Sequence, residues 1–184
     1  MTVEIISIGD ELLIGQTVNT NASWMGAELS LIGAQVAYCT VICDRESDIF
    51  GAIDTAIHRV DVVLITGGLG PTKDDITKKV LCDYFDCKLI RNSAVLKHVT
   101  DFFESRKKKM LEVNIAQADV PEKCDVLHNP NGTAPGMWFE LNEKVLVSMP
   151  GVPYEMKDIM SSEVIPRMQE MFALDSLYYR TILT

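Results

Sequence analysis

The hydrophobic positions of this chain form short unbroken runs that alternate with stretches of helical periodicity. Residues 3–8, 35–42 and 61–65 are runs rich in valine and isoleucine. Apolar runs of this length are typical of strands buried on both faces, as in a parallel sheet. The pattern therefore predicts three neighbouring parallel strands in the first 65 residues.

Between these runs, apolar residues recur at three- and four-residue steps, which is the spacing of one face of a helix. The two sets are Ala22, Met25, Leu29 and Ile32, and then Ile49, Ile53, Ala56 and Val60. Strands that alternate with helices are the signature of a doubly wound fold with right-handed crossovers. We predict a three-layer α/β fold around a mostly parallel sheet.

The second half of the chain has a looser pattern. It predicts helices at residues 93–106 and about 110–118, a hairpin of residues 137–140 and 145–148, and a long methionine-rich helix after Pro153. Residues 176–184 have the pattern of a further strand, in which the sequence stops. We expect one domain over residues 1–172, with residues 173–184 beginning a following segment.

The net negative charge of the chain limits the kinds of molecule that it is expected to bind. The net charge is −9 over 184 residues, whereas nucleic-acid phosphates are bound by clustered lysine and arginine. The one basic run, residues 106–109, lies in a stretch with helical character and indicates a solvated face. No apolar run approaches the roughly 20 residues that cross a bilayer, and the N-terminus has no export signal. We expect a cytoplasmic protein that binds neither nucleic acid nor membrane directly.

Cysteine and histidine positions indicate no zinc site and no nucleophilic triad. The five cysteines form no C-x-x-C pair, so we expect reduced, mostly buried thiols. The three histidines are scattered along the chain, which argues against a Ser-His-Asp or Cys-His site. Chemistry by carboxylates and a metal ion is what remains.

The most informative segment is TGGLGPTKDDIT, residues 66–77, which follows the third predicted strand. Gly67, Gly68 and Gly70 can adopt positive φ, which lets consecutive backbone N–H groups point at one anion. The spacing matches neither the dinucleotide-binding G-x-G-x-x-G nor the P-loop. The glycines predict a phosphate-binding loop of another kind.

Thr72 is a suitable N-cap for a helix that follows this loop, and the helix N-terminus would attract the same anion. A capping box between Thr72 and Asp75 explains those two residues equally well. It explains neither Asp74 nor the three glycines. The loop is therefore interpreted as a binding loop and not only as a turn.

The adjacent Asp74 and Asp75 would repel a phosphate unless a cation accompanies it. Mg²⁺ typically uses one or two carboxylates, several waters and the phosphate oxygens of the substrate. Asp44 and Glu11 follow other predicted strands, and ligands of open α/β sheets bind at such strand ends. Each acid alone is more typical of a cap or a solvated turn. Together they predict a divalent-metal site, suited to Mg²⁺, in which Asp74 or Asp75 is a metal ligand or a base and Asp44 and Glu11 complete the oxygen ligands.

Three polar segments accompany these residues. Asn21 is a natural N-cap for the first long helix, while Asn19 is expected to reach the site. Gly151 and Val152 can offer backbone N–H groups to an anion, although a rigid turn explains them equally well. Residues 129–136 have the composition of a turn. Gly67, Gly68, Gly70, Thr72, Asn19, Gly151 and Val152 form the predicted substrate-binding set.

Four motifs carry a resemblance to a known family. They are Gly-Asp-Glu-Leu at residues 9–12, Gly-Gly-Leu-Gly-Pro-Thr-x-Asp-Asp-x-Thr at 67–77, Asn-x-x-Gly-Thr-Ala-Pro-Gly at 129–136 and Met-Pro-Gly-Val-Pro at 149–153. They cover nearly the whole chain in order, and they resemble the N-terminal domain of the competence/damage-inducible CinA proteins. That domain is similar to the molybdopterin-binding fold of the MogA, MoaB and MoeA proteins. The resemblance implies this fold for residues 1–172.

The resemblance also implies an activity. CinA-type proteins are associated with a metal-dependent pyrophosphatase that acts on ADP-ribose, which makes this the leading hypothesis, with Mg²⁺ or Co²⁺ as the expected ion and Asp75 and Asp44 as the expected catalytic acids. In MogA-like enzymes, acids matching Asp44 and Asp75 act in the adenylylation of molybdopterin, so molybdopterin binding or adenylylation is the alternative. A non-catalytic module related to competence or DNA damage is a third. The expected ligand is a small nucleotide or pterin, and relatives of this fold form homo-oligomers, which we also expect here.

Overall fold

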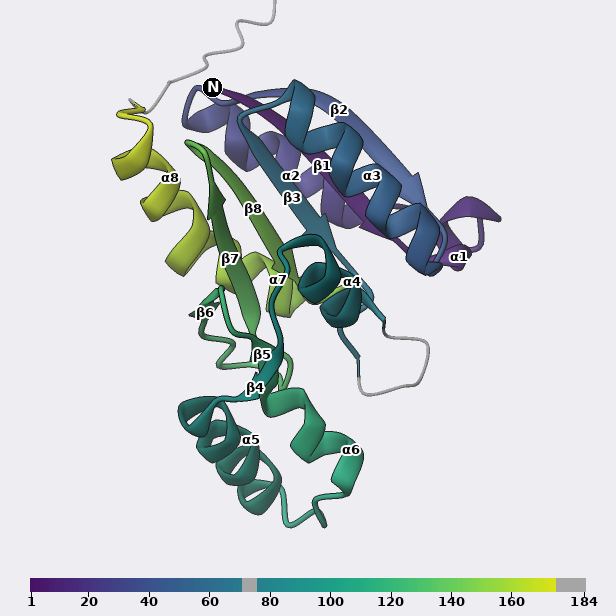
Figure 1. Cartoon of the computed structure of the whole chain (residues 1–184), viewed down its shortest axis with the longest axis vertical. Coiled ribbons are helices and arrows are strands. Elements are labelled where there is room, and N and C mark those ends of the chain that lie inside the picture. The colour runs from purple at the N-terminus through teal and green to yellow at the C-terminus, as the bar shows by residue number, and fades with distance from the viewer. Residues whose placement is uncertain (71–75, 175–184) are drawn as a thin grey trace, which may run out of the picture.

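The computed structural model describes residues 1–70 and 76–174, and a six-stranded sheet runs through them (Figure 1). The strand order is β2-β1-β3-β8-β7-β6. The strands are β1 (Thr2–Ile8), β2 (Gln35–Ile42), β3 (Val62–Thr66), β6 (Asp125–Leu127), β7 (Gly136–Leu141) and β8 (Lys144–Met149). β2, β1, β3 and β8 are parallel, whereas β7 pairs antiparallel with β8, and β6 pairs antiparallel with β7. The predicted mostly parallel sheet is confirmed.

Helices cover both faces of this sheet. α2 (Thr20–Leu31), α7 (Pro153–Ile159), the π-helical turn η2 (Met160–Val164) and α8 (Ile165–Met171) lie on one face, and α3 (Glu46–Arg59) and α4 (Thr77–Tyr84) lie on the other. Successive strand residues point to opposite faces, so Ile5 belongs to the first core and Ile6 to the second. Burying each such side chain contributes about 1.5–3 kcal/mol. The three-layer prediction is confirmed.

A smaller lobe is inserted between β3 and β7. It contains the two-stranded sheet of β4 (Leu89–Arg91) and β5 (Asp119–Pro121), with α5 (Ser93–Ser105), α6 (Glu112–Ile115) and the 3-10 helix η1 (Ala116–Ala118). Figure 1 shows the lobe beyond one end of the main sheet. Its own core is small and centres on Val95, Val99 and Ala118.

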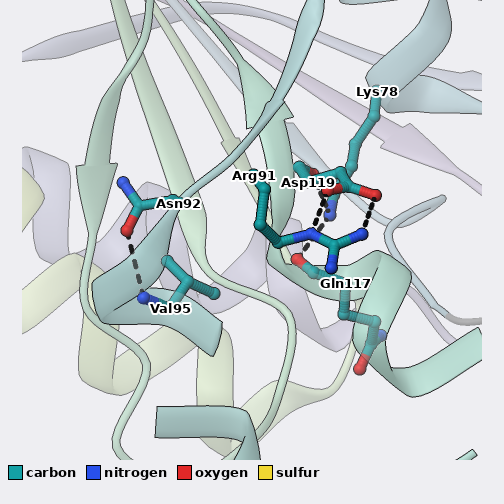
Figure 2. Close-up of polar contacts among 6 residues, drawn as sticks. All are labelled: Lys78, Arg91, Asn92, Val95, Gln117 and Asp119. Carbon is teal, nitrogen blue, oxygen red and sulfur yellow. Dashed lines mark hydrogen bonds and ion pairs between the residues drawn. The ribbon is translucent and has the colours of Figure 1, made fainter. Parts of the chain in front are cut away.

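Polar contacts connect this lobe to α4 (Figure 2). The Lys78 ammonium donates to the main-chain carbonyls of Gln117 and Asp119, at 2.8 Å each. Arg91 pairs with the Asp119 carboxylate, and the Asn92 side chain caps α5 by accepting from the backbone N–H of Val95 at 3.1 Å. The helix that begins at the end of the glycine loop is therefore tied directly to the lobe.

The predicted hairpin is confirmed, with longer strands and a tighter turn than the pattern indicated. β7 and β8 pair up to Leu141 and Lys144, which leaves only two residues in the turn. Asn142 and Glu143 have φ of 50° and 67°. Two left-handed residues are what a two-residue type I′ turn requires.

The long helix predicted after Pro153 is interrupted by the π turn η2, which ends just before Pro166 in the first turn of α8. Proline lacks the backbone N–H that donates a hydrogen bond in the interior of an α-helix. A π turn widens the helix at the point where this backbone hydrogen bond is missing. The three-residue strands β4, β5 and β6 and the four-residue helix α1 (Asp10–Leu13) were not predicted, because elements this short carry too little periodicity. The strand predicted at residues 176–184 lies outside the described residues.

The cysteines are free but less buried than expected. Cys82 is buried, Cys39 is exposed, and Cys43, Cys87 and Cys124 are partly exposed, so the expectation of mostly buried thiols is wrong. Burial raises the pKa of both Cys82 and Cys124 to about 12, which keeps these two side chains protonated at neutral pH.

A buried carboxylate lies on β1, within the sheet. Glu4 is 1% exposed and accepts hydrogen bonds from the Arg59 guanidinium, with Nε at 2.8 Å and Nη2 at 2.6 Å, and from the Thr40 hydroxyl at 2.6 Å. The guanidinium also lies 3.8 Å from the centre of the Tyr38 ring. The pair connects α3 to the sheet and satisfies a charge that would otherwise be buried alone.

Replacing Arg59 with methionine is expected to lower the free energy of unfolding by about 3 kcal/mol, because Glu4 then stays buried without a cation. Urea denaturation at pH 7 measures this change. The control is Lys79→Met, which removes the exposed ion pair with Glu46 and should cost less than about 1 kcal/mol. Equal losses in the two variants would contradict the role assigned to the buried pair.

Candidate functional site

The carboxyl ends of β1, β2, β3 and β8 lie side by side at one edge of the sheet, because these four strands are parallel neighbours. We call this edge the strand-end rim. It carries the segments that follow the four strands: residues 9–11, 43–44, 67–70 and 150–152. The predicted convergence of these segments is confirmed for the residues that the structure describes.

Gly67 lies where three of these backbones meet. Its φ is +109°, and a Cβ at this position would overlap the carbonyl oxygen of Ile8. A Cβ on Gly151 would lie 3.3 Å from the Gly67 Cα. The Gly67 N–H donates to the Met149 carbonyl at 3.1 Å. The prediction that this N–H faces an anion is therefore wrong, and the glycine serves close packing of the turns.

Gly68 forms the floor beneath two polar side chains. Its φ is +67°, and a Cβ here would overlap the Thr77 hydroxyl and lie 3.5 Å from Oδ1 of Asp44. Asp44 follows β2 and Thr77 begins α4, so residues far apart in the sequence meet over one glycine. This contact is direct evidence that Asp44 belongs to the rim beside the glycine loop.

Thr77 is a buried polar residue with an unmet hydrogen bond. It is 0% exposed, and its hydroxyl has no hydrogen-bond partner among the described residues. A buried polar group without a hydrogen bond lowers the free energy of unfolding by about 1–3 kcal/mol. Its presence in a native structure therefore needs an explanation, such as a bound ligand. Thr77 is thus a candidate ligand-binding residue that the sequence analysis missed.

α4 begins at Thr77, and its N-cap is Ile76, without a side-chain cap. The helix cap predicted at Thr72 falls on a residue that the structure does not describe. Thr72, Asp74 and Asp75 themselves lie outside the described residues. Their predicted roles in substrate and metal binding stay predictions.

The N-cap of α2 predicted at Asn21 is wrong. Asn19 is the N-cap of α2, since its Oδ1 accepts from the Ala22 N–H at 3.1 Å; its amide also donates to the Ser7 hydroxyl at 2.9 Å. Asn21 is buried and donates to the Thr66 hydroxyl at 3.1 Å and to the Gly151 carbonyl at 2.8 Å. Asn21 therefore connects α2 to the ends of β3 and β8, which helix periodicity alone gave no reason to expect.

Two cavities open at the rim, and Gly151 lines both of them. The first, of about 140 Å³, lies between α1, α2 and the strand ends. It is lined by Ser7, Ile8, Glu11, Leu12, Thr17, Val18, Asn19, Thr20, Asn21, Thr66, Gly151 and Pro153. Glu11, Asn19 and Gly151 thus line one hollow, whose described lining contains no arginine or lysine.

The second cavity, of about 250 Å³, lies between the rim and the lobe. It is lined by Leu69, Gly70, Phe102, Gln117, Asn131, Gly132, Thr133, Ala134, Pro150, Gly151, Val152, Tyr154 and Glu155. The predicted residues Gly70, Gly151 and Val152 lie here. Among the described residues, the N–H groups of Gly151 and Val152 donate to no backbone carbonyl, so they are available to a ligand.

The described part of the rim does not by itself form a protein-only metal site. Within residues 1–70 and 76–174, no group of three or more His, Cys, Asp or Glu side chains is placed to hold a metal ion. Glu11 lines the first cavity, whereas Asp44 lies over Gly68, so these two predicted ligands occupy different parts of the rim. The residues present still fit Mg²⁺, which needs only one or two carboxylates when a phosphate and waters supply the other oxygens.

Thr77, Asn21 and Glu155 were not assigned to the site from the sequence. Thr77 closes the glycine-rich motif, and Glu155 comes two residues after the Met-Pro-Gly-Val-Pro motif. Their positions in or next to these motifs could have indicated from the sequence that both residues belong to the site. Asn21 had no such signal, because its partners Thr66 and Gly151 are 45 and 130 positions away.

Comparison with known proteins gives consistent matches. The family model described as "Probable molybdopterin binding domain" matches residues 4–170. A CinA-like protein of Flavobacterium psychrophilum is 48% identical over an alignment that covers 100% of this chain and 44% of that protein. The chain therefore spans less than half the length of this curated relative.

Solved structures agree with this match. The structure of CinA from Thermoplasma acidophilum, described as having unknown function, aligns with a TM-score of 0.80 and 30% identity over 92% of this chain and 96% of that one. The molybdopterin biosynthesis enzyme MoaB from Thermus thermophilus aligns with a TM-score of 0.59 and 15% identity, over 94% and 96% of the two chains. The second likeness shows the shared fold.

No helix in the described parts of the chain is both long and apolar enough to cross a lipid bilayer.

Replacing Thr77 with valine is expected to leave the free energy of unfolding unchanged or to raise it by about 1 kcal/mol, because valine removes an unpaired hydroxyl without leaving a void. The matched control is Thr66→Val, at the same rim. The Thr66 hydroxyl accepts from Asn21 and donates to the Pro150 carbonyl, so this change should cost about 1–3 kcal/mol. Equal losses in urea denaturation would show that the Thr77 hydroxyl is already paired and is no candidate ligand.

Proposed function

This chain belongs to the "Probable molybdopterin binding domain" family and is similar along its whole length to CinA-like proteins, and from this premise we propose that its rim hydrolyses the pyrophosphate of a nucleotide-type ligand with a divalent cation. The ligand combines a heteroaromatic ring with a phosphate or diphosphate. ADP-ribose is the first substrate to test.

The observation that carries this proposal is the meeting of Asp44 and Thr77 over Gly68. It combines a carboxylate, a buried hydroxyl without a partner among the described residues, and a backbone held at positive φ. Oxygen ligands of this kind suit Mg²⁺, and exposed backbone amides suit the phosphate that the ion accompanies.

The charges around the cavities support a metal-assisted anion site. The linings of both cavities, as far as the structure describes them, contain the acids Glu11 and Glu155 and no lysine or arginine. A phosphate at such a rim is stabilised by backbone N–H groups, here those of Gly151 and Val152, and by a bound cation. The doubled aspartate, assigned from the sequence, fits the same scheme.

In this scheme Asp44 and Asp75 would hold the cation, and Asp74 and Glu11 would assist them, Glu11 from the first cavity. The ion, when bound, polarises a phosphoryl oxygen and lowers the pKa of a coordinated water. The chain's own groups then bind and orient the phosphates: the Thr77 hydroxyl and the amides of Gly151 and Val152 donate toward the oxygens on which negative charge develops.

A second candidate is the binding or adenylylation of molybdopterin. The family match and the shared fold with MoaB favour it. It uses the same rim for the phosphate and differs in the reaction. Pterin fluorescence that co-purifies with the protein, together with ATP consumption when molybdopterin is added, would favour this candidate over hydrolysis.

Replacing Asp44 with asparagine is expected to lower turnover of ADP-ribose, measured by product release with Mg²⁺ or Co²⁺, by about 100-fold or more, because the variant would hold less tightly the cation that stabilises the developing negative charge. Chelation of the metal should abolish turnover of the unaltered protein. The control is Asp54→Asn, which removes the same charge from an exposed site on α3 and should leave turnover unchanged. Unchanged turnover in Asp44→Asn would remove this residue from the mechanism.

A further inference from the structure

Three of the five cysteines gather where the lobe joins the main body. Cys82 lies in the last turns of α4, Cys87 lies between α4 and β4, and Cys124 lies between β5 and β6. The chain therefore enters the lobe beside Cys87 and leaves it beside Cys124. None of the three lines a cavity at the rim, so their chemistry is independent of the proposed function.

The end of α4 brings Cys82 and Cys87 together. The Cys87 N–H donates to the Cys82 carbonyl at 3.0 Å, and Asp86, the residue before Cys87, has a φ of 48°. This is the 6→1 hydrogen bond of a Schellman motif, in which the third residue from the helix end commonly packs against the residue that follows the left-handed one. Here both positions are cysteines, and a hydrogen bond joins their thiols.

The neck of the lobe places Cys124 beside this pair. The Glu122 N–H donates to the Lys88 carbonyl at 2.8 Å, which brings the residue after Cys87 close to the turn that carries Cys124. Cys87 and Cys124 also pack against the same apolar core, on the α3 and α4 side of the sheet. Cys124 is therefore the competing partner for Cys87.

The two thiols of the Schellman motif differ in access to solvent. Cys82 is 7% exposed, whereas Cys87 is partly exposed. Burial, followed by the interaction with Cys87, raises the pKa of Cys82 to about 12, so Cys82 is a neutral thiol at neutral pH. Exchange with a disulfide needs a thiolate that the reagent can reach. Cys87 is therefore the member of the pair that reacts first, and Cys82 lies behind it.

We propose that Cys82 and Cys87 form a reversible thiol–disulfide site at the end of α4, which a small disulfide such as oxidised glutathione converts to an internal disulfide. The Cys87 thiolate attacks one sulfur of the oxidant, forms a mixed disulfide and releases one glutathione. The Cys82 thiol then loses its proton, attacks the Cys87 sulfur and displaces the second glutathione. Two protein thiols are oxidised, one glutathione disulfide is reduced, and the two protons end on the two glutathione thiols.

The internal disulfide would fix the turn through which the chain passes from α4 into the lobe. Its formation is reversible, because excess reduced glutathione attacks the new bond and restores both protein thiols.

The test treats the reduced, unaltered chain with oxidised glutathione at pH 8.5, where thiolates are more abundant than at pH 7, and then blocks the remaining thiols with iodoacetamide. Peptide mass spectrometry is expected to find Cys82 and Cys87 joined and protected from alkylation in most chains, with the loss of two hydrogen atoms. Cys39, which is exposed on β2, is the internal control and should carry either glutathione or the alkyl group.

The variant Cys82→Ala separates the two steps, because Cys87 can still react but has lost its hydrogen-bonded partner. This variant is expected to keep glutathione on Cys87 as a mixed disulfide. The matched control is Cys124→Ala, which removes the other neighbouring thiol and should form the internal disulfide as the unaltered chain does. Urea denaturation of the reduced proteins shows whether both variants are folded, and the mapping of the unaltered chain needs neither of them.

A disulfide between Cys87 and Cys124 in the unaltered chain would overturn the assignment of the pair. Free Cys82 and Cys87 thiols in a sample whose Cys39 has taken up glutathione would overturn the site altogether. Either result leaves the proposed function standing, since turnover of ADP-ribose is measured separately, with the thiols kept reduced.

Discussion

The parallel alignment of β2, β1, β3 and β8 is the constraint on which the rest of the structure depends. Parallel neighbours bring all of their carboxyl ends to one edge, so the turns after four strands share a small space. Gly67 shows how small it is, since the turn at Gly151 packs against it on one side and the Ile8 carbonyl leaves no room for a side chain on the other. The rim exists because backbones, and not side chains, approach one another there.

Polar groups at the rim are divided between structure and ligand binding. The Thr66 hydroxyl and the Asn21 amide nitrogen use their hydrogen bonds on the turns, and they fix Gly151 relative to β3. Thr77, Glu155 and the Asn21 amide oxygen each keep at least one polar atom without a partner among the described residues. Unmet polar atoms in a buried position oppose folding. Their presence beside two cavities is consistent with a rim shaped for a polar ligand and stabilised elsewhere, by two apolar cores and the buried pair of Glu4 with Arg59.

The lobe gives this common fold its second cavity. Gln117 and Phe102 come from the lobe, while Tyr154 and Glu155 come from the helix that follows the rim. The Lys78 ammonium binds two carbonyls of the lobe and begins the chain of contacts from α4 to Gln117 and Thr133 (Figure 2). A movement of the lobe would therefore change the cavity and the start of α4 together.

The sequence by itself determined the layers, the parallel strands, the hairpin and the places where the strand ends carry unusual residues. Hydrophobic periodicity and turn composition are local signals, and they suffice for elements of about five or more residues. Only the tertiary structure decided that Asn21 and not Asn19 holds the rim together, that the Gly67 amide is used by Met149, and that Thr77 and Asp44 meet over Gly68. Each of these depends on contacts between residues far apart in the chain, whose distance and direction are set by the sheet register and cannot be read from the spacing of residues along one strand.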